Sequence, residues 1–388
     1  MLIVISLFVV FRQTLIQVVR GRSRCNGTID MNETSLNFLK TLLETPSPSG
    51  YEAKIQKVVR EWAGKFADEV RTDRHGNVHC VKKGSRSGQG ETQKLMLAGH
   101  CDQIALMIQH IDENGFLYVQ PIGGWDMQIL LGQHLTVWAK DGPLNGVLSR
   151  KATHLLTNDE RNKVPQFSDV WVDIGAKDKK EAEALVMNGD TITVRLGYRE
   201  LLNGLACSPG MDDKVGVWTV MEALRLVSEK NPIIDIHFVS TVQEEIGLRG
   251  ATTSAQGILP QVGLAVDVTH ATDTPGTDRK NLGEVKLGAG PVIHRGPNFN
   301  PKVIDRMMDV ARDFSIPNQI RGIPKGSGTD ANAMQMVGEG VAMGLIGIPN
   351  RYMHSPVEVV SLKDLEYSAV LLAEFCLSIK PEDSWIPE

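Results

Sequence analysis

Short apolar segments alternate with helix-like segments along most of this chain, and no other feature of the sequence restricts the fold as strongly. Apolar residues gather at 95–98, 233–242, 264–268 and 341–348, and each run predicts a buried strand. Segments between them carry apolar residues at helical spacing, as at 217–224. Buried strands separated by helices favour a mixed or parallel sheet with helices on both faces. We therefore expect an α/β fold built on a mixed sheet.

The pattern changes between about residues 106 and 195, where short strands alternate with glycine turns and one charged helix is expected at 177–186. The turns are Asn114-Gly115, Gly123-Gly124, Asp141-Gly142 and Asn188-Gly189. Such a region is typical of a small β-rich domain inserted into an α/β domain. The expected organisation is an N-terminal extension at 1–30, the first part of the α/β domain at 31–105, the inserted domain at 106–195 and the second part of the α/β domain at 196–388.

The two ends of the chain carry different local signals. Residues 1–11 are strongly apolar, but a membrane-spanning helix needs about 18 or more apolar residues. A signal peptide would place positive charge before this run and a small-residue cleavage site after it, and both are missing. We expect 1–30 to be a disordered tag or a wrongly assigned start, with a membrane anchor as the alternative. Near the other end, Ser361 followed by Asp364 predicts a capping box for the final helix.

Composition excludes several classes of protein and partner. The 41 basic and 46 acidic residues give a net charge of −5, and both signs are dispersed along the chain. A nucleic-acid-binding protein would show a basic patch or stripe, so no nucleic-acid partner is expected. The five cysteines are scattered and form no CxxC pair, which argues against a zinc ribbon and a disulfide framework. A reducing compartment fits this cysteine usage, and we expect a cytoplasmic protein without a membrane partner.

Residues that commonly bind metals lie near the ends of five predicted elements. They are His100, Asp212, the Glu244-Glu245 pair, Asp267 and His354. Each alone has an ordinary structural explanation, such as a helix cap for Asp212 or a surface turn for His354. Two consecutive carboxylates at the end of a core strand are harder to explain, because like charges repel in a partly buried place. In an open α/β sheet, ligands gather outside the carboxyl ends of the strands, so these side chains are expected to meet.

The residue types in this set indicate a particular chemistry. Two imidazoles and three carboxylates, with no thiolate, suit zinc, cobalt or manganese. Five ligands are one too many for a single tetrahedral zinc ion. If one carboxylate bridges, the same set serves two ions about 3.5–4 Å apart. The prediction is therefore two divalent metal ions per chain, with zinc or cobalt favoured and manganese possible as a third choice.

Five segments carry a resemblance to a known family. They are His100-Cys101-Asp102, Asp212-Asp213-Lys214-Val215-Gly216, Gln243-Glu244-Glu245-Ile246-Gly247, Asp267-Val268-Thr269 and Arg351-Tyr352-Met353-His354-Ser355-Pro356. In this order they resemble the tetrahedral (TET) aminopeptidases, dodecameric cytosolic di-metal peptidases that include glutamyl aminopeptidases. The resemblance covers roughly residues 35–379. It departs from the common pattern at Gln103, which stands where many relatives have an acidic residue, and at Lys214, where arginine is common.

The resemblance implies a role for each site residue. Asp212 is the bridging ligand, His100 and Asp267 complete one metal site, and Glu245 and His354 complete the other. Glu244 is the general base, and Asp102 orients His100. The implied fold is a mixed-sheet di-zinc peptidase domain, and the inserted β-rich domain is a dimerisation domain within a dodecamer.

The expected function is a metallo-aminopeptidase that removes N-terminal residues from short peptides, using a metal-activated hydroxide and Glu244 as general base. One alternative is a glycoside hydrolase of the endoglucanase type, which needs two carboxyl groups about 5–9.5 Å apart. The side chains of adjacent residues such as Glu244 and Glu245 tend to point to opposite faces, which argues against such a pair. Aromatic residues, on which sugars stack, make up only 5% of the chain. The other alternative is a catalytically inactive oligomeric scaffold. Arg321 and Lys325, near a glycine-rich stretch, either favour an acidic substrate side chain or are solvated loop cations.

Overall fold

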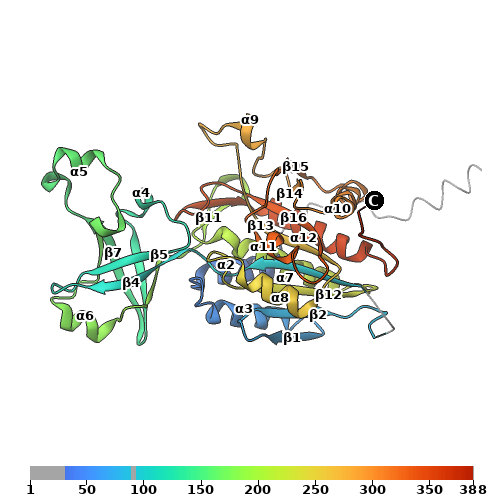
Figure 1. The fold of residues 1–388 in the computed structure, drawn as a ribbon, viewed down its shortest axis with the longest axis horizontal. Helices are drawn as coiled ribbons and strands as arrows, with labels where there is room; N and C mark the ends of the chain where they lie inside the picture. The colour runs from blue at the N-terminus through green and yellow to red at the C-terminus, as the bar shows by residue number, and fades with distance from the viewer. Residues whose placement is uncertain (1–30, 89–92, 388) are drawn as a thin grey trace, which may run out of the picture.

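The computed structural model describes residues 31–88 and 93–387, so the extension predicted at 1–30 lies outside the described residues. An eight-stranded sheet forms the centre of the larger body (Figure 1). In spatial order its strands are β1 (Glu69–Thr72), β2 (Val78–Lys82), β12 (Asp235–Thr241), β3 (Lys94–His100), β13 (Val262–His270), β16 (Ala342–Asn350), β14 (Val292–Arg295) and β15 (Gln319–Gly322). The four strands from β12 to β16 are parallel, whereas β2 and β14 are antiparallel to their neighbours in that group. Because the central strands are parallel, their carboxyl ends lie at one edge of the sheet.

Helices cover both faces of this sheet, which confirms the predicted α/β architecture. One layer contains α2 (Glu33–Glu44), α3 (Ala53–Ala63), α7 (Met211–Ser228), α10 (Pro301–Asp313) and α12 (Leu362–Ser378). The other contains α8 (Arg249–Ile258) and α11 (Asp330–Met334), which pack on each other and on the central strands (Figure 1). The short helix α9 (Arg279–Leu282) lies on a loop that projects from the body. Side chains of these elements, among them Leu97, Trp218 and Phe238, form one buried core.

A closed β-barrel projects from this body and has a core of its own (Figure 1). Its strands are β4 (Ala105–Ile111), β5 (Leu117–Ile122), β8 (Val170–Asp173), β7 (Gly142–Arg150), β6 (His134–Ala139) and β9 (Thr191–Val194). Three short helices accompany them: α4 (Met127–Leu130), α5 (Asn158–Asn162) and α6 (Lys179–Leu185). The expected β-rich insertion is confirmed. Its closure into a barrel, which leaves no unpaired sheet edge, was not predicted from the sequence.

A small antiparallel sheet lies beside the barrel and pairs the segment that follows the barrel in sequence with a strand near the C-terminus (Figure 1). It consists of β10 (Arg199–Glu200), β11 (Leu205–Ser208) and β17 (Glu358–Ser361). The capping box predicted next to it is wrong. Ser361 is the N-cap residue of α12, but its side chain makes no capping hydrogen bond. Asp364 instead accepts hydrogen bonds from the backbone N–H groups of Gly288 and Gly290, both at 2.7 Å. The amide of Gly290 is buried and would otherwise have no partner.

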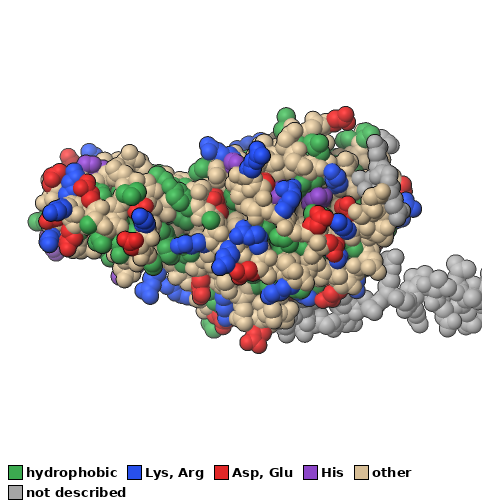
Figure 2. Space-filling view, turned by 90° about the horizontal axis from the view of Figure 1, so that it is seen from below, with side chains coloured by type: hydrophobic (Ala, Val, Ile, Leu, Met, Phe, Trp, Pro, Cys, Tyr) green, Lys and Arg blue, Asp and Glu red, His purple; other side chains and the backbone are tan. Residues whose placement is uncertain are grey.

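The surface carries both signs of charge. Figure 2 shows basic and acidic side chains interspersed over the larger body and the barrel on the face that it presents. Within the described residues, no helix is long and apolar enough to cross a membrane.

Candidate metal centre

The predicted site residues meet at the carboxyl ends of the central strands. His100 is the last residue of β3, and it pairs in parallel register with Thr241 at the end of β12. Glu244 and Glu245 follow β12 directly, while Asp267 lies toward the end of β13. Because β12, β3 and β13 are neighbouring parallel strands, residues at their ends come together although they are far apart in the sequence.

Asp212 enters this centre from the first turn of α7. The backbone is not helical at Asp212 and Asp213, and the peptide bond between them is cis. The Asp212 Oδ1 atom lies 3.2 Å from His100 Nε2, and its Oδ2 atom lies 3.2 Å from His354 Nε2. One carboxylate thus presents a different oxygen to each imidazole, which is the arrangement that a bridging ligand requires.

The ligand atoms divide into two groups. His100, Glu244 and Asp267 form the His100 group, and Asp212, Glu245 and His354 form the Asp212 group. Within each group the candidate ligand atoms all lie within 4.8 Å of one another. The structure therefore brings every sequence-predicted metal ligand together, and it also places the predicted base Glu244 inside a ligand group.

Asp102 holds the segment that carries the two glutamates. Its Oδ1 atom accepts the N–H of Glu244 at 3.0 Å, and its Oδ2 atom accepts the N–H of Glu245 at 3.1 Å. The His100 Nδ1 atom lies 3.1 Å from the Asp102 carbonyl oxygen and 3.5 Å from its Oδ1 atom. The nearer partner of the imidazole is therefore the backbone of Asp102, since its carboxylate is engaged mainly by the two amides.

Sequence reasoning missed Glu358, which is buried beside the centre at the start of β17. Its Oε2 atom accepts the N–H of Asp212 at 2.8 Å, and its Oε1 atom accepts the N–H of His354 at 3.0 Å. One carboxylate thereby links the backbones of two predicted ligands. The only signal in the sequence was that an acidic residue stands four positions after His354. This spacing does not show that its carboxylate accepts hydrogen bonds from backbone amides.

The barrel-side loop also contributes to the centre. His354 Nδ1 lies 2.9 Å from the carbonyl oxygen of Gly124, which follows β5. A Cβ atom at Gly124 would lie 3.2 Å from His354 Nδ1, so this close approach favours glycine. The contact leaves Nε2 of His354 as the nitrogen that faces Asp212 and Glu245.

The electrostatics of the centre are dominated by crowded carboxylates. Burial raises the pKa of Glu244 to about 9 and that of Asp267 to about 8, and mutual repulsion with Asp212 adds to both. Burial would also raise the pKa of Asp212, but hydrogen bonds with His100 and His354 outweigh it and hold this pKa below its usual value. Among the described residues, the two imidazoles are the only groups of these two ligand sets that can carry positive charge.

The residues fit a pair of divalent cations. The Glu245 Oε1 atom is buried and has no hydrogen-bond partner in the described part of the chain. The other donors are imidazole nitrogens and carboxylate oxygens, the types that bind zinc, cobalt and manganese. Two divalent ions would balance the carboxylates and give the free Glu245 oxygen a partner.

The centre opens into a cleft of about 800 Å³. Its walls include His270, His294, α9 and the glycine-rich segment 321–329. Arg321 Nη1 donates to Thr269 Oγ1 at 2.7 Å, and burial lowers the pKa of this guanidinium. No ion pair joins Arg321 to a carboxylate of the described residues, so its charge is available to a molecule in the cleft.

Comparisons with known proteins agree with this geometry. The family model described as M42 glutamyl aminopeptidase matches residues 76–371. The chain is 38% identical over 350 residues to a lysyl aminopeptidase of Pyrococcus furiosus, covering 89% of this chain and 98% of that protein.

Two solved structures are also similar. The TET aminopeptidase of a marine sediment thaumarchaeon superposes with a TM-score of 0.85 at 33% identity, covering 90% of this chain and 98% of its own. The Pyrococcus horikoshii TET1 peptidase, described as assembling into a tetrahedron or a large octahedral shell, superposes with a TM-score of 0.79 at 28% identity, covering 89% and 100% of the two chains.

Proposed function

The chain belongs to the M42 glutamyl aminopeptidase family and is a peptide-cleaving aminopeptidase, and we propose that it works with two divalent ions and Glu244 as general base. The observation that carries the proposal is the division of six ligand-type side chains, all lining one cleft, into two groups. A metal-dependent peptidase needs such a centre next to a space for its substrate.

Each side chain has a task in this proposal. His100 and Asp267 would hold one ion, Glu245 and His354 would hold the other, and Asp212 would contribute to both sites. When bound, the ions lower the pKa of water and polarise the carbonyl of the first peptide bond.

Glu244 moves the proton in the proposed reaction. Its carboxylate takes a proton from water as the water oxygen bonds to the carbonyl carbon, and it gives that proton to the leaving amine as the C–N bond breaks. Burial raises the pKa of Glu244, whereas two divalent cations beside it would favour its ionised form, which is the form that can accept a proton. Asp102 keeps Glu244 aimed at the centre by accepting its backbone N–H.

The cleft suggests which peptides the enzyme takes. A volume of about 800 Å³ suits the first residues of a short peptide better than a folded protein. Arg321 offers a half-buried positive charge in this cleft that no carboxylate of the described residues neutralises, and Lys325 lines the same wall. We therefore propose a preference for an acidic N-terminal side chain.

The two alternative functions are less well supported. A glycosidase needs two carboxyl groups that flank one bond, whereas Glu244 and Glu245 belong to different ligand groups. An inactive scaffold would be expected to have lost a ligand or the base, and all these residues are present.

Self-association is part of the proposal. The barrel would join two chains into a dimer, and dimers would form a dodecameric shell, as the comparison with the TET1 peptidase suggests. Support comes from apolar side chains that the barrel leaves exposed, including Leu155 at 68% and Val164 at 51%. A cytoplasmic location is also proposed, because Cys80, Cys101, Cys207 and Cys376 are free thiols.

The direct test is a screen of aminoacyl-amides, short peptides and cello-oligosaccharides with zinc, cobalt or manganese added to the dialysed protein. We expect release of the N-terminal residue from peptides and no cleavage of peptides with an acetylated N-terminus. Release of sugars without peptide cleavage would support the glycosidase instead.

A further inference from the structure

Two buried carboxylates hold three consecutive backbone N–H groups directly after β12. Asp102 accepts those of Glu244 and Glu245, as described above. The preceding N–H, that of Gln243, donates to Glu52 Oε1 at 3.1 Å. Glu52 lies 191 positions earlier in the chain, just before α3, so a second distant element holds the segment that carries the general base.

Gln243 needs such a partner because of its backbone conformation. Its φ angle is 56°, in the left-handed region that costs free energy for a residue other than glycine. The backbone at residue 243 sets the direction in which the chain continues to Glu244. A hydrogen bond that holds Gln243 in this conformation therefore also sets where the Glu244 carboxylate points.

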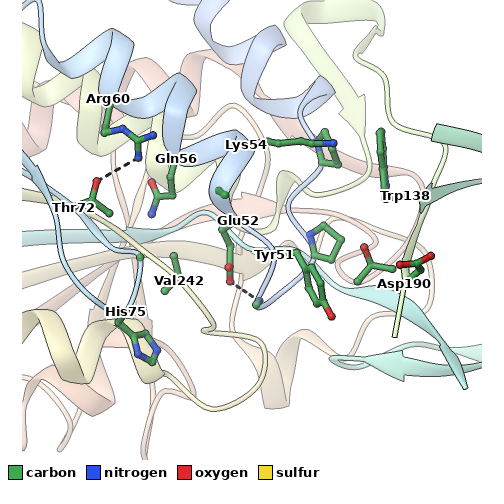
Figure 3. Close-up of a pocket in the computed structure, with 16 residues that line it drawn as sticks. Tyr51, Glu52, Lys54, Gln56, Arg60, Thr72, His75, Trp138, Asp190 and Val242 are labelled. Carbon is green, nitrogen blue, oxygen red and sulfur yellow. Dashed lines mark hydrogen bonds between the residues drawn. The ribbon is translucent and has the colours of Figure 1, made fainter. Parts of the chain in front are cut away.

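Glu52 is itself firmly placed for this task. Its side chain is 6% exposed, and its Oε1 atom also accepts the N–H of Gly50 at 2.6 Å (Figure 3). One turn later on α3, Gln56 Nε2 donates to the carbonyl oxygen of Ser240 at 2.9 Å. The start of α3 thus contacts the chain at two points, within the end of β12 and two residues beyond it.

An ordinary structural role does not explain this carboxylate. Glu52 occupies the N-cap position of α3, where a side chain would normally accept an N–H of the helix, but it makes no capping hydrogen bond. It is also placed away from the proposed substrate cleft. Glu52 lines a separate cleft of about 590 Å³, together with Lys54 and Trp138, and it is not part of the wall of the catalytic cleft (Figure 3).

We propose that Glu52 is a positioning residue for the proposed general base, holding Gln243 so that Glu244 faces the metal centre. This inference rests on the proposed function. Glu52 acts only through the backbone of Gln243, so its loss should lower kcat, whereas KM and the number of bound ions should change little. A substitution that keeps an acceptor oxygen in the same place should preserve the effect.

The test compares Glu52→Ala, Glu52→Gln and the matched control Gln56→Ala, which removes the neighbouring contact of α3 but not the one to Gln243. We expect Glu52→Ala to lower kcat about 10–100-fold, because small misplacements of a catalytic group are this costly. Glu52→Gln should stay within about 3-fold of the wild type, and Gln56→Ala should lower the melting temperature without a comparable loss of kcat. Metal analysis should give the same ion content for all folded proteins.

Three outcomes would count against the inference. Full kcat in folded Glu52→Ala, with a lowered melting temperature as in Gln56→Ala, would make Glu52 purely structural. If Glu52→Ala does not fold, Glu52→Asp takes its place, because its shorter side chain withdraws the acceptor oxygen from Gln243. A kcat of Glu52→Asp equal to that of Glu52→Gln would then overturn the inference. A wild type that cleaves no peptide would overturn the proposed function itself, which sets that failure apart from the other two.

Discussion

Glu244 and Glu245 are neighbours in the chain, yet their carboxylates face different imidazoles. Glu244 Oε2 lies 3.8 Å from His100 Nε2, whereas Glu245 Oε2 lies 3.5 Å from His354 Nε2. The chain leaves β12 and turns at these residues, so a single pair of neighbours can serve both ligand groups. This division is what allows the two glutamates to have separate tasks.

The first prediction separates those tasks. Glu244→Gln keeps the size of the side chain but cannot accept a proton, so it should bind both ions and lose about 10²–10⁴-fold in kcat. Glu245→Gln should first weaken metal binding, and added metal should restore part of its activity. Metal content and turnover measured on the same samples test this. Near-full activity in Glu244→Gln, with Glu245→Gln inactive although fully loaded, would reverse the two roles.

Metal stoichiometry provides the second prediction. Elemental analysis of protein saturated with zinc or cobalt and then dialysed should find about two ions per chain, since the ligands form two groups. Asp212→Ala should lower the content of both ions, because each oxygen of Asp212 faces a different imidazole. His354→Ala should lower only one, and the exposed His154→Ala is the control. One ion with full activity would contradict the two-metal proposal.

Substrate preference depends on Arg321 in our proposal. Arg321→Ala should lower the ratio of kcat/KM for glutamyl over leucyl peptides by about 10–100-fold, the worth of one hydrogen bond between charged groups. Arg295→Ala is a suitable control, since Arg295 lies on the adjacent strand β14 but is exposed and outside the cleft wall. An unchanged ratio in Arg321→Ala would show that the guanidinium does not select the substrate.

His237 should make the stability of the fold depend on pH. Burial lowers its pKa from 6.5 to about 4, so on acidification the unfolded chain takes up a proton before the folded one. Neutral His237 gives its full contribution to the free energy of unfolding above pH 6.5, and this contribution is lost as the pH falls toward 4. The loss is about 2 kcal/mol at pH 5. Urea unfolding at fixed protein concentration should show a smaller loss between pH 7.5 and pH 5 for His237→Phe than for the wild type. Equal losses in both proteins would rule out this residue as the cause.

The assembly proposal predicts a large particle. Light scattering should give a mass several times that of one 42.6 kDa chain, reaching that of a dodecamer if the shell forms. Leu155→Asp with Val164→Asp should reduce this mass if the barrel surface makes contacts between chains, because a buried unpaired charge is costly. A mass of one chain at every concentration would remove self-association from the proposal.

Local residue patterns were sufficient to predict the α/β class, the β-rich insertion and the identity of the candidate ligands. The reason is that apolar periodicity reports burial, and metal-binding residue types at strand ends are few. His100 and Asp267 could be found in this way because each lies at or near the end of an apolar run. The same kind of reasoning failed for Ser361 and Asp364, where a local capping pattern was overridden by the distant amides of Gly288 and Gly290.

Only the tertiary structure decided which carboxylates hold the centre in shape. Glu52 and Glu358 accept backbone N–H groups that lie 191 and 146 positions away in the chain, at Gln243 and Asp212. A backbone amide has the same chemistry at every residue, so no sequence pattern marks the one that a buried carboxylate will reach. Residue types therefore determined what this protein can bind, whereas the parallel packing of β12, β3 and β13 determined that the binding groups meet and how they are aimed.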